Sequence, residues 1–404
     1  MATNTIQAGN IINPAHLMKT SGSEFSIVPI ANFHFDASMP YAFNDIFSLS
    51  DGGLKYMLDI DKIATNTGRN KYFLFRSSFD WIHFSGKKDN AIWRFAIEEK
   101  LTAASGFHNN FLHMINSGNM KFLGQEYTMG LSLGEIHLRS VNFSWSQAIN
   151  EKIDAGITAK FYSGRSWFTL QSGVYLYTQE KLEYIDMGIS GKGKSSVPVL
   201  LSQITGREGT NIQFFNYLFG IRNPGLGFDL GINYKANENI QLSASINDLG
   251  IIYWNRNTTS FTADGEYRWN GIDISGPLNL ETFKNLRESN SLVAFRDTFL
   301  NGLIQPSNDS YITNSPISFN AGANIKINDR LSLATTIETY YFSNFNKFNF
   351  AFAGIFKPWN RFSLTSGLMF SNRAFLSIPI SLAYNGKLIN ASVSTYNSIG
   401  LLLT

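Results

Sequence analysis

Residues 225–235, GLGFDLGINYK, decide the fold class of this chain. Every second position is apolar: Leu226, Phe228, Leu230, Ile232 and Tyr234. The positions between them are small or polar: Gly227, Asp229, Gly231, Asn233 and Lys235. Because successive side chains of a β-strand point to opposite faces, this period of two predicts a strand with one apolar face and one small polar face.

The same alternation recurs along most of the chain. It is clear in ISFNAGANIKIN at 317–328 and in FLSIPISLAYNG at 375–386. Further strands of this kind are expected near 25–37, 72–85, 91–103, 135–147, 153–163, 166–178, 240–253, 331–342, 347–357, 361–371 and 388–396. Short polar segments such as GKKDN, TQEK and INDR separate many of them, which predicts antiparallel hairpins.

Four longer inserts interrupt the pattern, near 38–70, 105–125, 190–224 and 274–314. When the chain is followed up and down, the inserts fall at one end of the strands and the short turns at the other. Tight periplasmic turns and long outside loops are typical of outer-membrane barrels. We therefore expect a single antiparallel transmembrane β-barrel of about 14–16 strands.

A pair of soluble β-sandwiches is the alternative, because a sandwich strand also has one buried face. Two observations favour the barrel. Only 16% of the residues are charged, whereas a soluble domain carries about 25%. The polar faces carry mainly Ser, Gly, Asn and Ala, as expected for the wall of a wide lumen, and the apolar faces quoted above carry no charge.

Several other classes of protein are disfavoured. The chain has no cysteine, its net charge is only +3, and no apolar run is long enough for a transmembrane helix. No nucleic-acid partner is expected from so mild a charge. The six histidines show no metal-ligand spacing, and no catalytic serine motif is present, so we expect no metal, no cofactor and no enzymatic activity. The first 20 residues have no apolar core of signal-peptide length, so any signal peptide is expected to have been removed.

One motif superficially suggests a nucleotide. In GISGKGKSS at 188–196, Gly188, Gly193, Lys194 and Ser195 have the spacing of a phosphate-binding loop. Such a loop functions between a buried parallel strand and a helix N-terminus, and neither is expected here. We predict an exposed outside loop and no nucleotide site.

Aromatic residues add support for a membrane location. Trp81, Trp93, Trp145, Trp167, Trp254, Trp359 and Tyr384 fall at or near the ends of predicted strands. Interfacial aromatic girdles occupy such positions in membrane barrels.

A family resemblance rests on short motifs. Asn13, Pro14 and Ala15 form an Asn-Pro-Ala signature that resembles the N-terminus of the long-chain fatty-acid transporter superfamily of outer-membrane barrels, whose Bacteroidota relatives include barrels of the type IX secretion system. Residues 223–254 resemble a Bacteroidota barrel family of unknown function, through Asp229, Gly231, Tyr234, Asp248, Leu249, Gly250 and Trp254. Lys160 and Gly164 match a strand end of that same family.

The resemblance implies a division of the chain. Residues 1–23 would form a hatch-like segment folded into the lumen, although a disordered N-terminus is the alternative. Residues 24–404 would form the barrel, with a closing C-terminal strand missing after the segment LINASVSTYNSIGLLLT.

The segment Asp248-Leu249-Gly250 breaks the alternation, since the apolar phase shifts by one residue after Ile246. A bulge or bend explains the shift. By resemblance, a kinked strand there would make a lateral opening in the wall, whereas an ordinary structural bulge is the alternative.

Two functions remain open for a protein placed in the cell outer membrane among lipid and lipopolysaccharide. The first is transport of a hydrophobic small molecule, which the resemblance favours. The second is a non-transporting barrel subunit that docks partner outer-membrane proteins or surface lipoproteins.

Overall fold

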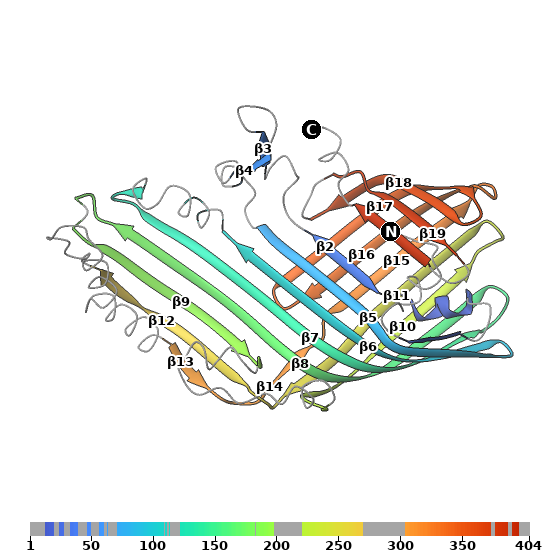
Figure 1. Cartoon of the computed structure of the whole chain (residues 1–404), viewed down its shortest axis with the longest axis horizontal. Coiled ribbons are helices and arrows are strands. Elements are labelled where there is room, and N and C mark those ends of the chain that lie inside the picture. The colour runs from blue at the N-terminus through green and yellow to red at the C-terminus, as the bar shows by residue number, and fades with distance from the viewer. Residues whose placement is uncertain are drawn as a thin grey trace.

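In the computed structural model, the structure describes residues 13–19, 24–27, 33–38, 47–49, 56–59, 63, 71–108, 110, 113, 122–181, 183–197, 220–269, 304–372, 376–386 and 390–395. Eighteen strands form one antiparallel sheet, and a separate hairpin joins two short strands (Figure 1). No helix in the described part of the chain has the length and hydropathy needed to cross a bilayer.

Most of the strands form a curved wall. Its strands are β1 (Glu24–Ile27), β2 (His34–Ser38), β5 (Lys71–Lys88), β6 (Ala91–Phe107), β7 (Glu126–Ala148), β8 (Ile153–Thr178), β10 (Pro224–Lys235), β11 (Ile240–Trp254), β15 (Ile317–Lys326), β16 (Leu331–Phe342), β17 (Phe345–Trp359), β18 (Phe362–Ser371), β19 (Ile380–Asn385) and β20 (Asn390–Thr395). Neighbours along the wall pair antiparallel, from β5 through β8 to β10 and on to β20, with β1 and β2 paired to β5.

The remaining elements lie beside or inside this wall. They are the 3-10 helix η1 (Pro14–Lys19), β3 (Phe47–Leu49), β4 (Tyr56–Leu58), β9 (Ile185–Ser195), β12 (Thr259–Trp269), β13 (Ile304–Ser307) and β14 (Tyr311–Asn314). Strands β3 and β4 make the separate hairpin.

The apolar face of the wall points outward. In β10 the five apolar side chains from Leu226 to Tyr234 are 39–59% exposed, whereas Asp229 and Asn233 on the other face are 5% and 0% exposed. The same is true of β17, where Phe348, Phe350, Phe352 and Phe356 are all exposed. A soluble sandwich buries its apolar face, so this arrangement excludes it. The fold is a single antiparallel transmembrane β-barrel, as the alternation predicts.

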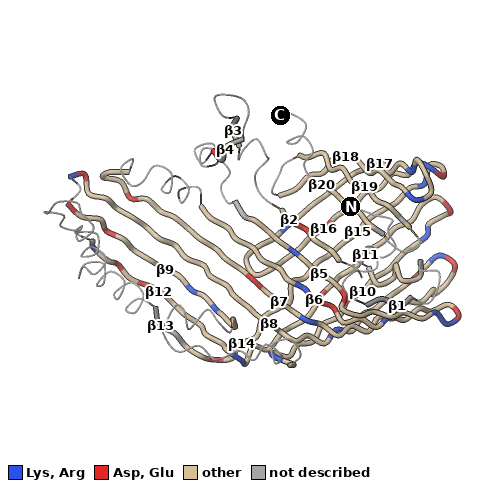
Figure 2. Tube along the Cα trace, in the orientation of Figure 1, with Lys and Arg blue, Asp and Glu red and all other residues tan. Residues whose placement is uncertain are grey.

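The short turns lie at one end of the wall, at the right of Figure 1. Figure 2 shows charged residues of both signs in these turns. Three of these turns share one device. The side-chain oxygens of Asn150, Asn237 and Asn328 each accept hydrogen bonds from the backbone N–H groups two and three residues ahead, at 2.8–2.9 Å. An asparagine side chain that mimics a backbone carbonyl in this way stabilises a tight hairpin turn.

The two edges of the wall run in the same direction. Both β2 and β20 run away from the short-turn end, since β2 is antiparallel to β5 and β20 is antiparallel to β19. Among the described residues, no ladder joins β20 to β2 or β5. To close, an antiparallel wall needs one strand between β20 and β2 that runs toward the short-turn end. The closing strand therefore stays a prediction.

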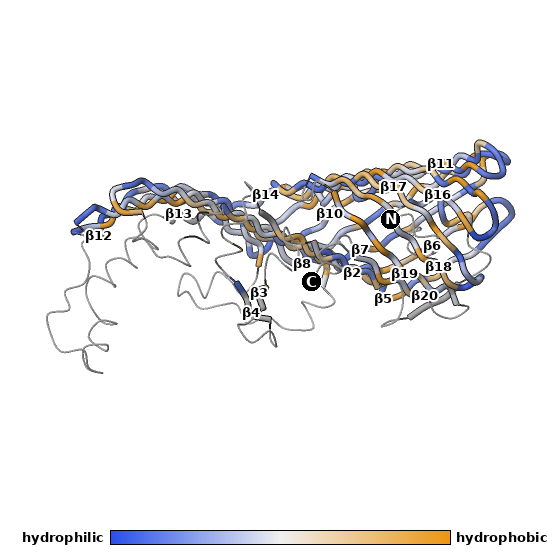
Figure 3. Tube along the Cα trace, turned by 90° about the horizontal axis from the view of Figure 1, so that it is seen from above, coloured by the Kyte–Doolittle hydropathy of each residue, from blue (hydrophilic) through white to orange (hydrophobic). Residues whose placement is uncertain are grey.

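A single-layered sheet projects beyond the barrel at the other end (Figure 3). Strand β8 pairs with β10 through residues 153–163 and with β9 through residues 168–178, so it belongs to both parts. Strand β12 pairs with β9, and β13 with β12. Two predicted strands, 153–163 and 166–178, are therefore one, and the TQEK turn lies at the far tip of this sheet and not among the short turns.

The prediction of an outside loop at 188–196 is wrong, because residues 188–195 lie in β9. The two glycines of the motif face aromatic rings of the flanking strands. A Cβ atom on Gly188 would lie 1.8 Å from the ring of Tyr175, and one on Gly193 would lie 2.1 Å from the ring of Phe261. The glycines let these rings lie against the backbone. This packing explains why glycine occupies both positions, with no need for a role in phosphate binding.

Candidate functional site: the kink of β11 and the contacts across the lumen

Strand β11 changes phase at Asp248. Up to Asn247 the odd-numbered residues face inward, and beyond Asp248 the buried residues are Ile252 and Trp254. Asp248 has φ = +57°, in the left-handed region, which aspartate tolerates better than most residues. The register with β10 shifts at this point, from Leu230↔Ile246 to Phe228↔Leu249. The phase shift seen in the sequence therefore corresponds to a β-bulge.

Side chains hold the backbone at the bulge. The N–H of Asp248 donates to Oδ1 of Asp229 at 2.6 Å. On the other side, β11 pairs with β15 up to Asn247 and with β14 from Ile251, so the intervening residues lie outside both ladders. Ser315, between β14 and β15, donates its hydroxyl to the carbonyl of Asp248 and its N–H to the carbonyl of Gly250 at 3.0 Å. On this side of β11, two bonds from Ser315 thus replace a ladder, whereas Leu249 and Gly250 stay paired with β10 on the other side.

The carboxylate of Asp248 points into the lumen and is the centre of a charged cluster. It accepts hydrogen bonds from Nζ of Lys100 at 2.8 Å, from Nζ of Lys160 at 2.6 Å and from the hydroxyl of Tyr162 at 3.1 Å. Lys160 also pairs with Asp229 at 2.8 Å, and Lys100 lies 3.5 Å from Glu98. We call Glu98, Lys100, Lys160, Asp229 and Asp248 the kink cluster.

The pair formed by Lys100 and Asp248 crosses the lumen. Lys100 lies on β6 and Asp248 on β11, and β7, β8 and β10 separate these strands along the wall. Strands lie about 4.8 Å apart, so the path along the wall is several times longer than the contact. The two side chains therefore meet inside the curve of the wall.

Other contacts also cross the lumen. Arg76 of β5 pairs with Asp36, its ladder partner on the neighbouring strand β2, and reaches across to Glu338 of β16 at 3.1 Å. Lys347 of β17 lies 3.3 Å from Asp36. The hydroxyls of Thr102 on β6 and Tyr340 on β16 are 2.9 Å apart. Opposite parts of the wall are thus joined by hydrogen bonds and ion pairs.

An aromatic layer adds to these contacts. The ring of Trp167 lies 5.9 Å from that of Trp254 and 5.8 Å from that of Phe342, and Trp254 lies 6.5 Å from Tyr311. Trp167 and Trp254 are 5% and 0% exposed. The prediction of an interfacial girdle is therefore wrong for these two tryptophans, because both face inward. Trp167 packs against Phe342 of β16, and Trp254 packs against Gly164 of β8 and its ladder partner Tyr311.

The Asn-Pro-Ala motif lies on the inner face of the wall. Asn13 precedes η1, and its side-chain N–H groups donate to the carbonyls of Ile232 and Ala244, each at 3.3 Å. The backbone of Pro14 fits over Gly156, where a Cβ atom would lie only 2.5 Å from the carbonyl carbon of Pro14. The hydroxyl of Ser146 donates to the carbonyl of Ala15 at 3.5 Å. Residues 1–12 and 20–23 of the predicted hatch lie outside the described residues.

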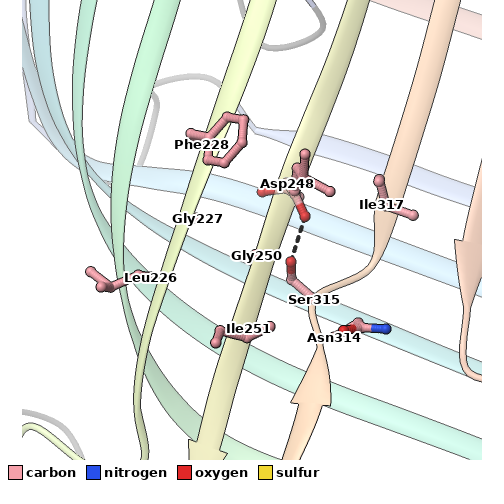
Figure 4. A pocket seen from close by; sticks show the side chains of 10 residues that line it. Leu226, Gly227, Phe228, Asp248, Gly250, Ile251, Asn314, Ser315 and Ile317 are labelled. Atoms are coloured by element: carbon pink, nitrogen blue, oxygen red, sulfur yellow. Dashed lines mark hydrogen bonds between the residues drawn. The ribbon is translucent and has the colours of Figure 1, made fainter.

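A depression of about 480 Å³ opens at the bulge on the outer face (Figure 4). It is lined by Leu226, Gly227, Phe228, Asp248, Leu249, Gly250, Ile251, Asn314, Ser315 and Ile317. Its rim is mostly apolar, and its floor is the part of β11 that has no ladder partner on its β15 side.

The sequence pattern identified part of this site. The phase shift located Asp248, and a motif located Lys160, but nothing in the sequence pairs them with Lys100, Tyr162 or Ser315. Lys100 stands at an inward position of β6, which is the only signal that could have selected it. Among the described residues, no group of three or more His, Asp or Glu side chains could hold a metal ion.

Comparisons with known proteins place the chain in a family. No curated protein matches it in sequence. Solved structures with a similar fold include a ΔS2S3 mutant of the monoaromatic hydrocarbon channel TodX (12% identity, TM-score 0.45, covering 98% of this chain and 89% of that one). They also include a FadL homologue of Pseudomonas aeruginosa (10%, 0.43, 95% and 82%) and the toluene transporter TbuX of Ralstonia pickettii (11%, 0.41, 94% and 85%). The family profile, which matches residues 18–396, makes the assignment. The chain belongs to the family of unknown function DUF5723.

Proposed function

We propose that this protein is an outer-membrane barrel that passes a hydrophobic small molecule through its wall at the bulge of β11. The depression around Asp248 is the observation that carries the proposal. It combines an apolar, lipid-facing entrance with the one stretch of β11 that has no ladder partner on its β15 side.

The outer-membrane location follows from the wall. Its apolar residues face outward on strand after strand, and the bilayer is the environment that such a surface requires. Closed barrels with short turns at one end and long connections at the other are typical of the Gram-negative outer membrane. The short turns would then face the periplasm, and the projecting sheet the cell exterior.

A lateral route fits the interior better than a route along the barrel axis. The ion pairs of Arg76 and Lys100, the contact between Thr102 and Tyr340, and the aromatic layer all cross the lumen. Water and solutes moving along the axis would have to separate these contacts. A molecule entering from the side at Leu249 meets the bulge and, on its lumen side, the kink cluster.

The test is saturable photolabelling in lipid vesicles, with an alkyl diazirine as the probe and the same alkane without the diazirine as competitor. We expect labelling near Leu249 that excess competitor suppresses, and labelling at Phe350 that it does not, because Phe350 lies on the lipid-facing stripe of β17, outside the depression. Ile317→Trp, which fills the depression, should abolish the saturable fraction. Phe319→Trp, one outward position further along β15 and outside the depression, is the matched control. Labelling at Leu249 that no excess of competitor reduces would refute the proposal.

The contacts across the lumen also fit the second function, a barrel that anchors partner proteins. Copurification from native membranes separates the two. A stoichiometric partner in the absence of any saturable labelling would favour an anchoring subunit over a transporter.

A further inference from the structure

We infer that Asp248, Lys100 and Lys160 form a latch that holds the wall closed at the bulge and can release while each lysine keeps a second carboxylate partner. That a molecule passes when the latch opens is a statement that rests on the proposed function. The latch itself is a property of the wall and is tested separately.

Contacts to Asp248 keep the bulge in place. All three parts of Asp248 are held: its N–H by Asp229, its carbonyl by Ser315 and its carboxylate by the two lysines. Ladder bonds supply none of these contacts. Leu249 and Gly250 stay in the ladder with β10, whereas on the β15 side Ser315 replaces a ladder. The strongest of the side-chain contacts to Asp248 are the charge-assisted bonds to its carboxylate.

The ion pairs of Asp248 pull the bulge in one direction, toward the lumen. Lys100 reaches Asp248 from β6, on the far side of the lumen, and so pulls the bulge inward. Lys160 on β8 is 3% exposed and also pulls from inside. No ion pair to Asp248 from the lipid side occurs among the described residues. Loss of the inward bonds would let the segment between Asn247 and Ile251 move outward, toward the depression.

The positive and negative charges of the kink cluster are unequal in number. The kink cluster holds three carboxylates and two lysines. When Asp248 leaves, Lys160 keeps Asp229 at 2.8 Å, and Lys100 keeps Glu98, whose nearest oxygen is 3.5 Å away. Each lysine thus has a second partner. Breaking a buried pair normally leaves a charge uncompensated. Here the lysines stay paired, and the one charge that loses its lysines is the Asp248 carboxylate, whose side chain is 16% exposed.

Burial separates the fixed pair from the releasable one. The side chains of Lys160 and Asp229 are 3% and 7% exposed, whereas those of Lys100 and Asp248 are 24% and 16% exposed. Water can reach the second pair as it separates. The more buried pair remains in place as the anchor, and the more accessible pair is the one that opens.

The test uses the fact that the chain contains no cysteine, so two can be introduced cleanly. Nitroxides are attached at Leu226→Cys and Ile317→Cys, which face lipid on either side of β11, and their separation is measured by pulsed EPR in vesicles. Asp248→Asn is the informative variant, because asparagine also tolerates a positive φ and the change removes only the charge. We expect one narrow distance in the parent and a second population, longer by about 5 Å (one strand spacing), in Asp248→Asn.

Glu338→Gln is the matched control, since it breaks another ion pair across the lumen away from the bulge. It should leave the distance unchanged. If Asp248→Asn does not fold, Lys100→Gln tests the same bond from the other side. A distance distribution in the latch variant identical to that of the parent and of Glu338→Gln would overturn the latch. A longer distance without saturable photolabelling would keep the latch and reject the proposed transport.

Discussion

At the scale of single residues, glycine and aromatic side chains work together in this wall. Rings lie over Gly188 and Gly193 in β9, over Gly227 in β10 and over Gly164 in β8. Each glycine removes the Cβ atom that would hold a ring away from the backbone. The Gly-Lys-Ser spacing in β9 is a by-product of this packing, which a sequence motif cannot distinguish from a phosphate-binding loop.

A substitution in β9 tests this explanation. Gly188→Ala should destabilise the projecting sheet by about 1–3 kcal/mol, because the new methyl group overlaps the ring of Tyr175. Gly130→Ala in β7 of the same sheet is the control, since its Cβ atom would meet nothing closer than 3.7 Å. Hydrogen exchange of β9 amides is the measurement. Equal exchange in the two variants would show that the ring does not need the glycine.

The Asn-Pro-Ala motif gives a second prediction at this scale. Gly156→Ala should displace η1, because its Cβ atom would lie 2.5 Å from the backbone of Pro14. Limited proteolysis of the N-terminal segment in folded protein is the measurement, and we expect at least a several-fold faster cleavage. Gly354→Ala in β17, whose Cβ atom would have 3.9 Å of clearance, should cleave at the parental rate. Unchanged cleavage of Gly156→Ala would mean that η1 does not depend on this seat.

At the scale of elements, period-two alternation located most wall strands and the outer half of β8, but not β9 and β12 of the projecting sheet. Strands β10, β15 and β17 have one apolar face against lipid, so burial imposes a strict pattern that a reader can see. Strand β9 has three glycines and two lysines, and its contacts are with neighbouring strands and not with a bilayer. Its sequence therefore alternates only over residues 185–190 and loses the pattern in the glycine- and lysine-rich residues 191–195. For the same reason the continuity of β8 through Gly164 was hidden by a local break in the alternation.

The apolar stripe of β17 predicts a position-dependent cost for charge. Phe350→Arg, near the middle of the lipid-facing stripe, should lower the free energy of unfolding by about 2–4 kcal/mol. Trp359→Arg, at the turn end of the same strand, should cost about 0–1 kcal/mol, because the guanidinium group reaches water there. Denaturant unfolding in lipid vesicles measures both. Equal costs would place β17 outside the hydrocarbon region.

At the scale of the whole molecule, the side chains that cross the lumen divide its interior. The charged pairs and the aromatic layer come from strands that are distant in sequence, such as β5 and β16. Their individual residues could be assigned to the inner face from the alternation, but which of them meet depends on the curvature of the wall. A single sequence does not specify that curvature, so the cross-lumen contacts were not predictable.

These contacts predict that the barrel does not conduct. In planar bilayers the protein should show no stepwise ionic current, because the aromatic layer and the ion pairs occupy the lumen. Replacing Trp254 and Phe342 together by alanine should allow small, intermittent currents, whereas the lipid-facing pair Phe350→Ala and Phe352→Ala should not. Large steady currents in the parent protein would contradict a crossed lumen.

The outward position of the apolar face supports every other conclusion, and a nitroxide scan of β17 measures it most directly. Labels placed one at a time at residues 346–356 in vesicles report their accessibility to oxygen, which concentrates in lipid, and to a water-soluble nickel chelate. We predict a period of two, with labels at Phe348, Phe350 and Phe352 accessible to oxygen and shielded from nickel. Labels at those three positions that nickel reaches as readily as it reaches a soluble surface would contradict the account.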